Sequence, residues 1–153
     1  MNYLIVFLIS MLPVVESRGA VPVGYASGMG WIPCMLLCIL GNFLPVPFIL
    51  LFIRALLKRM KKNKYLHKAA DWLINKAHKN TKKVLKYASF GLIIFVAVPL
   101  PGTGAWTAAL IAALMDMRLK YAAPSIFTGV VIAAFIITGV VYGFLDFLRF
   151  ILI

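Results

Sequence analysis

Long apolar runs separated by short polar breaks dominate this chain. A helix rises about 1.5 Å per residue, so crossing about 30 Å of hydrocarbon takes roughly 20 apolar residues. The runs from Trp31 to Ile53 and from Pro124 to Leu145 meet that length. We therefore expect two spanning helices, at residues 31–53 and 124–145.

Two other apolar stretches are interrupted by Gly and Pro. Residues 88–115 contain VPLPGTG, which leaves two arms of about 16 Å, each about half of a bilayer. Residues 1–30 consist of an apolar arm to Val15, a break at ESRGAVPVG and a short second arm. This pattern predicts two re-entrant hairpins, whose irregular backbone is tolerated at membrane depth only where protein or a wet cavity satisfies its polar groups.

The composition places the chain among membrane proteins. Hydrophobic residues make up 63% of the 153 residues, well above the roughly 45–50% of soluble domains, and the mean hydropathy is +0.99. The net charge is +12, and most of the sixteen Lys and Arg residues lie between Arg54 and Lys86. We expect an all-α integral membrane protein with one concentrated basic segment.

The basic segment, residues 54–87, is predicted to form an amphipathic helix. Apolar residues recur at helical spacing among its lysines: Leu66, Ala70, Leu73, Ala77 and Val84. The positive-inside rule places this segment in the cytoplasm, and Arg118 with Lys120 in a later loop predict the same side. We interpret it as a topology determinant lying against anionic headgroups, with specific partner recognition as the alternative.

Together these segments predict two inverted halves, each a re-entrant hairpin plus a spanning helix, joined by the basic cytoplasmic helix. Such an arrangement is typical of secondary transporters, in which broken helices meet near the midplane. We expect the chain to lie in a prokaryotic cell membrane in contact with lipids. Because each chain supplies only two full spans, we also expect a homodimer.

Several other functions are disfavoured. The sequence contains no catalytic triad, zinc-ligand set or phosphate-binding loop motif, so we expect no enzyme activity, no metal and no cofactor. The basic segment carries no nucleic-acid-binding motif, so we expect no nucleic-acid partner. Cys34 and Cys38 share a helix face in an apolar run and are interpreted as packing residues.

Glu16 and Arg18 are the first candidates for chemistry. A charge at the centre of a membrane helix costs roughly 2.5–3.5 kcal/mol, so each needs a partner, a cavity or a proton. In the functional interpretation Glu16 exchanges a proton and Arg18 holds an anionic group. The alternatives are that Arg18 neutralises Glu16 or caps the facing hairpin, or that both lie at the membrane interface. Direct pairing would need the turn or extended backbone that Gly19 and Pro22 favour.

The second hairpin offers an anion site at the arm that begins near Ala105. Free N–H groups and the helix dipole favour an anion there, and hydroxyl groups lie beside them. The alternative is a tight tip whose N–H groups meet protein carbonyls. Trp106 is placed to stack on an amphiphile or to lie at the membrane interface. The candidate residues of this region are Pro99, Pro101, Gly102, Thr103, Gly104, Trp106 and Thr107.

Asn42 adds a polar group to the first spanning helix. Pro45 and Pro47 follow it and predict a kink at this point. The simplest role for the Asn42 amide is a hydrogen bond to a hairpin tip. Asp116 and Asp146 lie at predicted segment ends, where carboxylates cost little, and are weaker candidates than Glu16.

Three motifs resemble those of a known family. ESRGAVP is similar to the Glu-x-Arg-Gly-Ala-Ile-Pro signature of the small multidrug export family, GNFLPV to its Gly-Asn-x-x-Pro element, and PLPGTGAW to its second-half signature. More distantly, the chain resembles the DedA/VTT superfamily of lipid scramblases and proposed polyprenyl-phosphate flippases. This resemblance implies a transporter-like fold with paired re-entrant hairpins. DedA proteins commonly carry Arg near the prolines of the second hairpin, where this chain reads FVAV at residues 95–98.

We therefore expect ESRGAVPVG to face PLPGTGAW at a midplane site. The expected function is transport or flipping of an amphiphilic, anionic substrate or lipid, with proton coupling through Glu16 as an option. Two other classes stay open. One is a non-transporting scaffold or lipid-organising protein, and the other is an ion channel, which would need a continuous polar lining.

Overall fold

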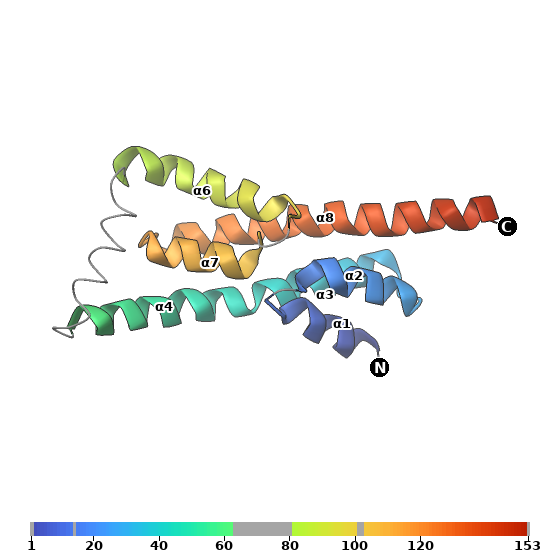
Figure 1. Cartoon of the computed structure of the whole chain (residues 1–153), viewed down its shortest axis with the longest axis horizontal. Coiled ribbons are helices and arrows are strands. Elements are labelled where there is room, and N and C mark those ends of the chain that lie inside the picture. Colours follow the sequence, from blue (N-terminus) through green and yellow to red (C-terminus); the bar gives the residue numbers. More distant parts are fainter. Residues whose placement is uncertain (1, 14, 63–80, 101–102, 153) are drawn as a thin grey trace.

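The computed structural model describes residues 2–13, 15–62, 81–100 and 103–152, and its elements over these ranges are α-helices. They lie along one another in an elongated bundle (Figure 1). Two segments, Trp31–Leu56 and Leu119–Phe147, are long and apolar enough to cross a membrane, with mean hydropathies of 2.5 and 2.2. With the apolar composition, this makes the chain a helical membrane protein.

Each half of the chain contains two short helices followed by a long rod. The first half comprises α1 (Asn2–Met11), α2 (Glu16–Ala26), α3 (Trp31–Phe43) and α4 (Pro45–Lys62), and the second comprises α6 (Thr81–Ala97), α7 (Ala105–Leu114) and α8 (Leu119–Leu152). In the first half α3 and α4 together form the rod (Figure 1). In the second half α8 alone forms it.

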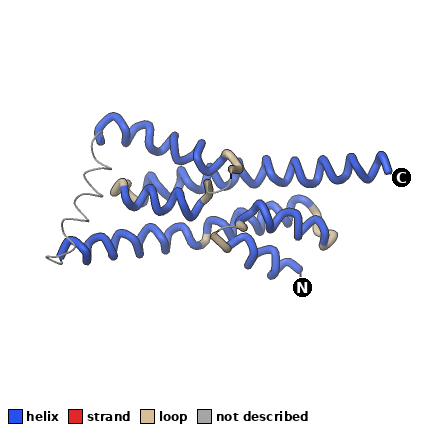
Figure 2. The backbone as a smooth tube through the Cα atoms, in the orientation of Figure 1, coloured by secondary structure: helices blue, strands red, loops and turns tan. Residues whose placement is uncertain are grey.

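The two pairs of short helices point in opposite directions. The α1–α2 pair opens toward the end of the bundle that holds both chain termini, and the α6–α7 pair opens toward the end where α4 stops (Figure 1). Their non-helical breaks lie in the middle of the bundle, as the tan segments of Figure 2 show. The two breaks are therefore placed to contact one another.

The helices α2 and α7 end in the same way. Gly28 and Asp116 follow the last turns with φ of 71° and 53°, and the next N–H groups, those of Met29 and Met117, bond back to carbonyls five residues earlier at 3.0 Å in both cases. This is the Schellman motif, in which a left-handed residue, usually Gly and at times Asn or Asp, closes the helix. Met29 and Met117 are both buried. Each short helix thus turns sharply into the rod that follows.

Small residues let the helices approach closely. The alanines of α7 are buried between its neighbours: Ala105, Ala108, Ala109, Ala112 and Ala113. In the first half, a Cβ at Gly24 of α2 would overlap the Sγ of Cys34 in α3. Close backbone contact through small residues is a main source of helix association in lipid. Cys34 and Cys38 are both free and buried, which agrees with their interpretation as packing residues.

The predicted break at residues 16–24 lies earlier in the structure. Residues 12, 13 and 15 lie outside the helices, and ESRGAVPVG lies in the helix α2, which contains Pro22. A proline inside a helix removes one backbone hydrogen bond. An open turn would remove more, and lipid supplies no replacement donors. The extended backbone that Gly19 and Pro22 were expected to favour is therefore absent from the described structure of this segment.

Other boundaries differ from the predictions in smaller ways. The span predicted at 31–53 is interrupted at Leu44, because Pro45 and Pro47 remove two N–H donors from the ladder there. The second span begins at Leu119 rather than Pro124, and the first arm of the second hairpin begins at Thr81 rather than Ala88. The central part of the predicted basic helix, residues 63–80, lies outside the described residues.

Candidate functional site

Glu16, the first residue of α2, caps the start of α7. Gly104 precedes α7 and has no side chain to bond the free N–H groups of the first turn. The Glu16 carboxylate accepts hydrogen bonds from the N–H groups of Ala105 and Trp106 instead, and the residue is 6% exposed. A carboxylate at a helix N-terminus also meets the positive end of the dipole. The predicted anion position on α7 is thus filled by Glu16.

The backbone of Glu16 is held in an uncommon conformation. Its φ is 48°, in the left-handed region that residues with a Cβ seldom adopt. Strain of this kind costs on the order of 1–3 kcal/mol and persists where surrounding contacts fix it. The contact of the carboxylate with α7 is one such contact. The bend of the first hairpin and the start of α7 therefore depend on each other.

Arg18 binds the loop of the opposite hairpin. Its guanidinium donates hydrogen bonds to the carbonyl oxygens of Leu100 and Thr103 and to Thr103 Oγ1, at 3.1 Å. Among the described residues, all its hydrogen bonds go to this loop and none to Glu16. This is the alternative in which Arg18 caps the facing hairpin.

Thr103 organises the loop that Arg18 binds. Its Oγ1 lies 2.8 Å from the carbonyl oxygen of Val98 and 2.8 Å from that of Leu100. The same oxygen accepts a hydrogen bond from the N–H of Leu100 at 3.2 Å. A hydroxyl group can donate once and accept twice, so this one side chain replaces several missing helix bonds. The loop keeps its shape through Thr103 and is attached to the first hairpin through Arg18.

Trp106 makes the reciprocal contact. Its Nε1 donates to the carbonyl oxygen of Met11, the last residue of α1, at 3.1 Å. Each hairpin therefore satisfies broken backbone groups of the other: Glu16 and Arg18 act from the first, and Trp106 acts from the second. Mutual capping of this kind is what irregular backbone needs inside a membrane. We call the set Glu16, Arg18, Thr103 and Trp106 the hairpin junction.

Asn42 lies beside the junction at the end of α3. Its Nδ2 donates to Ser17 Oγ at 3.3 Å, and both residues are 2% exposed. Within the described part of the chain, Asn42 Oδ1 has no hydrogen-bond partner. The predicted contact between Asn42 and a hairpin tip is present, since Ser17 lies in the first turn of α2.

An apolar groove begins at the junction. It lies between α4 and α7, has a volume of about 620 Å³ and is open on one side. Its walls are Phe48, Ile49, Phe52, Ile53, Leu56, Trp106, Thr107 and Leu110. A volume of this size is typical of small-molecule sites. Trp106 belongs both to the groove and to the junction, so the two are continuous.

The comparisons with known proteins agree with these motifs. The model of a family described as "Putative small multi-drug export protein" matches residues 16–136, which begin at Glu16 and include the junction. The chain belongs to this family. No curated protein and no solved structure gives a significant match. Membership of the small multidrug export family is thus confirmed, whereas the more distant DedA/VTT resemblance stays a prediction.

The other residues that the sequence predicted for the site lie in α2, in the loop after α6, in the groove or outside the described residues. Pro22 lies on the exposed side of α2, and Pro99 is exposed in the loop after α6. Thr107 lines the groove. Gly19 lies in α2, where a Cβ would overlap Val15. Pro101 and Gly102 lie outside the described residues.

Sequence reasoning missed three participants. Ser17 stood between the two charged candidates, and its place on the buried side of α2 could be found from helical spacing once α2 is known to be a helix. Met11 and Leu100 take part through carbonyl oxygens. A backbone acceptor has no side-chain signal, so these two required the structure.

Proposed function

We propose that this chain is a membrane transporter that moves or flips an amphiphilic, anionic substrate or lipid through the hairpin junction. The observation that carries the proposal is the position of Glu16 and Arg18. Both charges lie in an apolar chain and join the two hairpins across their breaks. Charge in such a position is costly and in membrane proteins commonly marks a substrate or ion pathway.

The bonds of the junction are of a kind that a substrate can replace. Arg18 is bonded to neutral oxygens of Leu100 and Thr103. A carboxylate or phosphate would bind a guanidinium more strongly than these neutral acceptors, because charge-assisted hydrogen bonds are roughly twice as strong. An anionic head group would therefore displace the loop from Arg18 and loosen the junction.

Glu16 supplies the proton-linked step of the proposal. As a carboxylate it accepts the N–H groups of Ala105 and Trp106 and is stabilised by the helix dipole. On protonation it loses the charge on which both interactions depend. Proton uptake would therefore release α7 from α2, and proton loss would restore the contact. The apolar tail of the substrate would lie in the groove beside Trp106.

The opposite directions of the two pairs of short helices support a wider architecture (Figure 1). We propose that the oppositely directed pairs α1–α2 and α6–α7 are re-entrant hairpins of two inverted halves, which rock about the junction to expose it to each side in turn. A second copy of the chain would complete the wall of the pathway, since two spans enclose little. The end of the bundle where α4 stops would face the cytoplasm of a prokaryotic cell.

A flipping assay tests the proposal. Purified protein is placed in vesicles of phosphatidylcholine containing a fluorescent phosphatidylglycerol, and dithionite quenching reports how much label reaches the outer leaflet. We expect faster exchange than in protein-free vesicles, a loss of exchange in Arg18→Gln, and a loss of the response to a pH gradient in Glu16→Gln. Asp146→Asn is the matched control, because Asp146 bonds to Tyr25 away from the junction. Equal exchange in wild type and Arg18→Gln would contradict the proposal.

A second candidate is a lipid-organising scaffold. The mutual capping of the two hairpins favours it, because Glu16 and Arg18 already have protein partners. A scaffold predicts that the vesicle assay shows no exchange with any variant, while Arg18→Gln still lowers thermal stability. The same set of proteins thus separates the two functions.

A further inference from the structure

Arg54 has a half-buried side chain with an unused pair of donors. It lies near the end of the first span, Trp31–Leu56. Its Nε and Nη2 atoms are buried and, in the part of the chain that the structure describes, have no hydrogen-bond partner. These two nitrogens form the side edge of the guanidinium, which matches the two oxygens of a carboxylate or phosphate.

The position of this side chain is unusual for an arginine at the end of a span. Long basic side chains in such places normally extend their charged end to water. Here two of the three guanidinium nitrogens are buried, where an unpaired charge is costly. A bound anion would remove most of that cost.

The described carboxylates do not supply the anion. The chain has four acidic residues. Glu16 caps α7, Asp146 bonds to Tyr25, and Asp116 is exposed in the connection between α7 and α8. Asp71 lies outside the described residues. None of the three described carboxylates therefore bonds to the Nε or Nη2 of Arg54.

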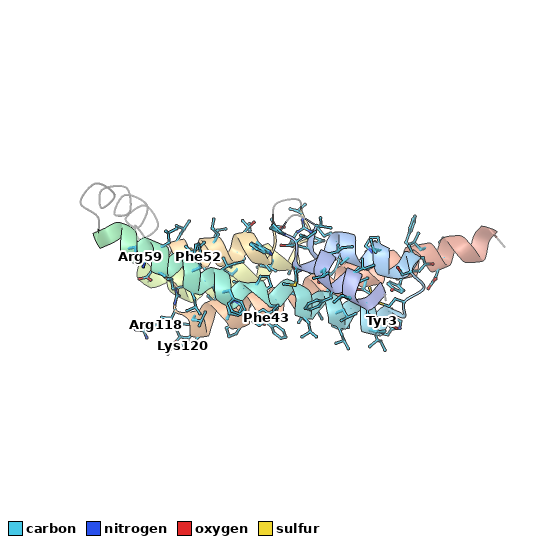
Figure 3. The ribbon with its side chains drawn as sticks, turned by 90° about the horizontal axis from the view of Figure 1, so that it is seen from below. Tyr3, Phe43, Phe52, Arg59, Arg118 and Lys120 are labelled. Atoms are coloured by element: carbon cyan, nitrogen blue, oxygen red, sulfur yellow. The ribbon has the colours of Figure 1, made fainter. Side chains whose placement is uncertain are left out.

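The surroundings favour an anion with an apolar tail. Arg59, Arg118 and Lys120 lie at the same end of the bundle (Figure 3), and their combined positive potential attracts anions. Ile53 and Leu56, in the same turn of α4 as Arg54, line the apolar groove. A ligand held at this turn has both positive charge and apolar surface within reach.

We propose that Arg54 is an anion-binding site that takes the phosphate group of an anionic amphiphile through Nε–H and Nη2–H. The site is separate from the hairpin junction and does not depend on transport. The same chemistry would accept a phospholipid head group or a free phosphate, and the experiment distinguishes these sources.

Thermal unfolding of the purified protein in nonionic detergent, with native mass spectrometry of bound lipid, tests the site. The probes are short-chain phosphatidylglycerol, short-chain phosphatidylcholine and inorganic phosphate. We expect phosphatidylglycerol to raise the unfolding temperature most. Arg54→Lys keeps the positive charge but loses the paired Nε–H and Nη2–H donors. The apparent affinity of this variant for phosphatidylglycerol should be about tenfold lower than that of wild type, or lower still. A larger rise with inorganic phosphate would support the anion site and assign it to a soluble ligand.

Two further variants keep the test interpretable. Arg59→Gln changes an exposed arginine of the same helix and should lower the affinity far less than Arg54→Lys does, because it removes a screened surface charge and no hydrogen bond to the ligand. Arg54→Gln should be at least as stable as wild type without lipid, because it removes an unpaired buried charge, and should show little gain with lipid. An undiminished gain in both Arg54 variants would overturn the proposal. So would a lower stability without lipid in Asp71→Asn combined with a larger gain on adding phosphatidylglycerol, because Arg54 would then be paired with Asp71 in the wild-type chain.

Discussion

The carboxylate of Glu16 occupies the space that a side chain at Gly104 would fill, because a Cβ built on Gly104 would overlap both carboxylate oxygens. The missing side chain therefore has a function: it lets the start of one hairpin cap the start of a helix in the other. With Arg18 bonded to the neighbouring loop, the two charged residues that looked expensive in the sequence are both satisfied across the middle of the bundle.

Gly104→Ala is expected to displace the Glu16 carboxylate from α7. Because hydrogen bonds to a charged group contribute about 1.5–3 kcal/mol each, we expect a loss of at least about 2 kcal/mol in stability, measured by thermal unfolding in detergent. Gly91→Ala in α6 is the matched control, since a Cβ there has open space. It should be neutral or stabilising by up to about 1 kcal/mol. Equal effects at the two glycines would show that the contact with Glu16 contributes little.

The stability of the protein should depend on the hydroxyl group of Thr103 more than on its methyl group. Thr103→Val leaves the carbonyl oxygen of Val98 and the N–H of Leu100 without this partner and should cost about 1–3 kcal/mol. Thr103→Ser should retain most of the stability. Thr128→Val is the control, because its hydroxyl bonds within its own helix on the exposed side. A tolerant Thr103→Val variant would mean that the loop does not rely on this hydroxyl.

Glu16 and Arg18 are expected to be partly coupled. Each side chain bonds to a different part of the second hairpin, Glu16 to N–H groups of α7 and Arg18 to loop carbonyls. The two charges also attract one another. The variant carrying both Glu16→Gln and Arg18→Gln should therefore be less stable than either single variant, with a loss smaller than the combined losses. Rescue of stability in the double variant would instead favour direct neutralisation of one charge by the other. Four unfolding curves decide between these outcomes.

Gly24 and Cys34 should show second-site compensation. A methyl group at Gly24 would overlap Cys34 Sγ, and overpacking of this kind typically costs about 1–3 kcal/mol. Gly24→Ala should therefore be destabilising, and adding Cys34→Ala should recover part of the loss by removing the sulfur. Thermal unfolding of the single and double variants measures this. If adding Cys34→Ala lowers the stability further, the contact between Gly24 and Cys34 does not limit how closely α2 and α3 pack.

Cysteine labelling should place the two ends of the bundle on opposite sides of the membrane. Both termini lie at one end of the bundle, and α4 stops at the other (Figure 1). In a background with Cys34→Ser and Cys38→Ser, a cysteine at Lys62 should react from the cytoplasmic side. Cysteines added at the two chain ends should react from the outside. Labelling of the termini from the cytoplasm would contradict the two-hairpin topology.

The sequence alone determined the class of the protein and the segments that matter. Apolar runs of the required length gave the two spans, because the thickness of a bilayer fixes how many residues a helix needs. Gly and Pro clusters located the second break at residues 98–104 and indicated that ESRGAVPVG and PLPGTGAW would meet. The isolated charges Glu16 and Arg18 were evident in the sequence because placing a charged side chain in a membrane costs free energy.

The tertiary structure decided how those segments are used. It moved the first break to the segment between α1 and α2 and made α2 helical through Pro22, because a membrane favours the conformation with fewest unsatisfied backbone groups. It also gave Arg18 to the loop rather than to Glu16 and left Arg54 with an unpaired edge. These outcomes depend on which backbone carbonyls and N–H groups lie opposite a side chain. Every residue carries the same backbone groups, so the sequence does not mark them, and only the packing of the two halves selects them.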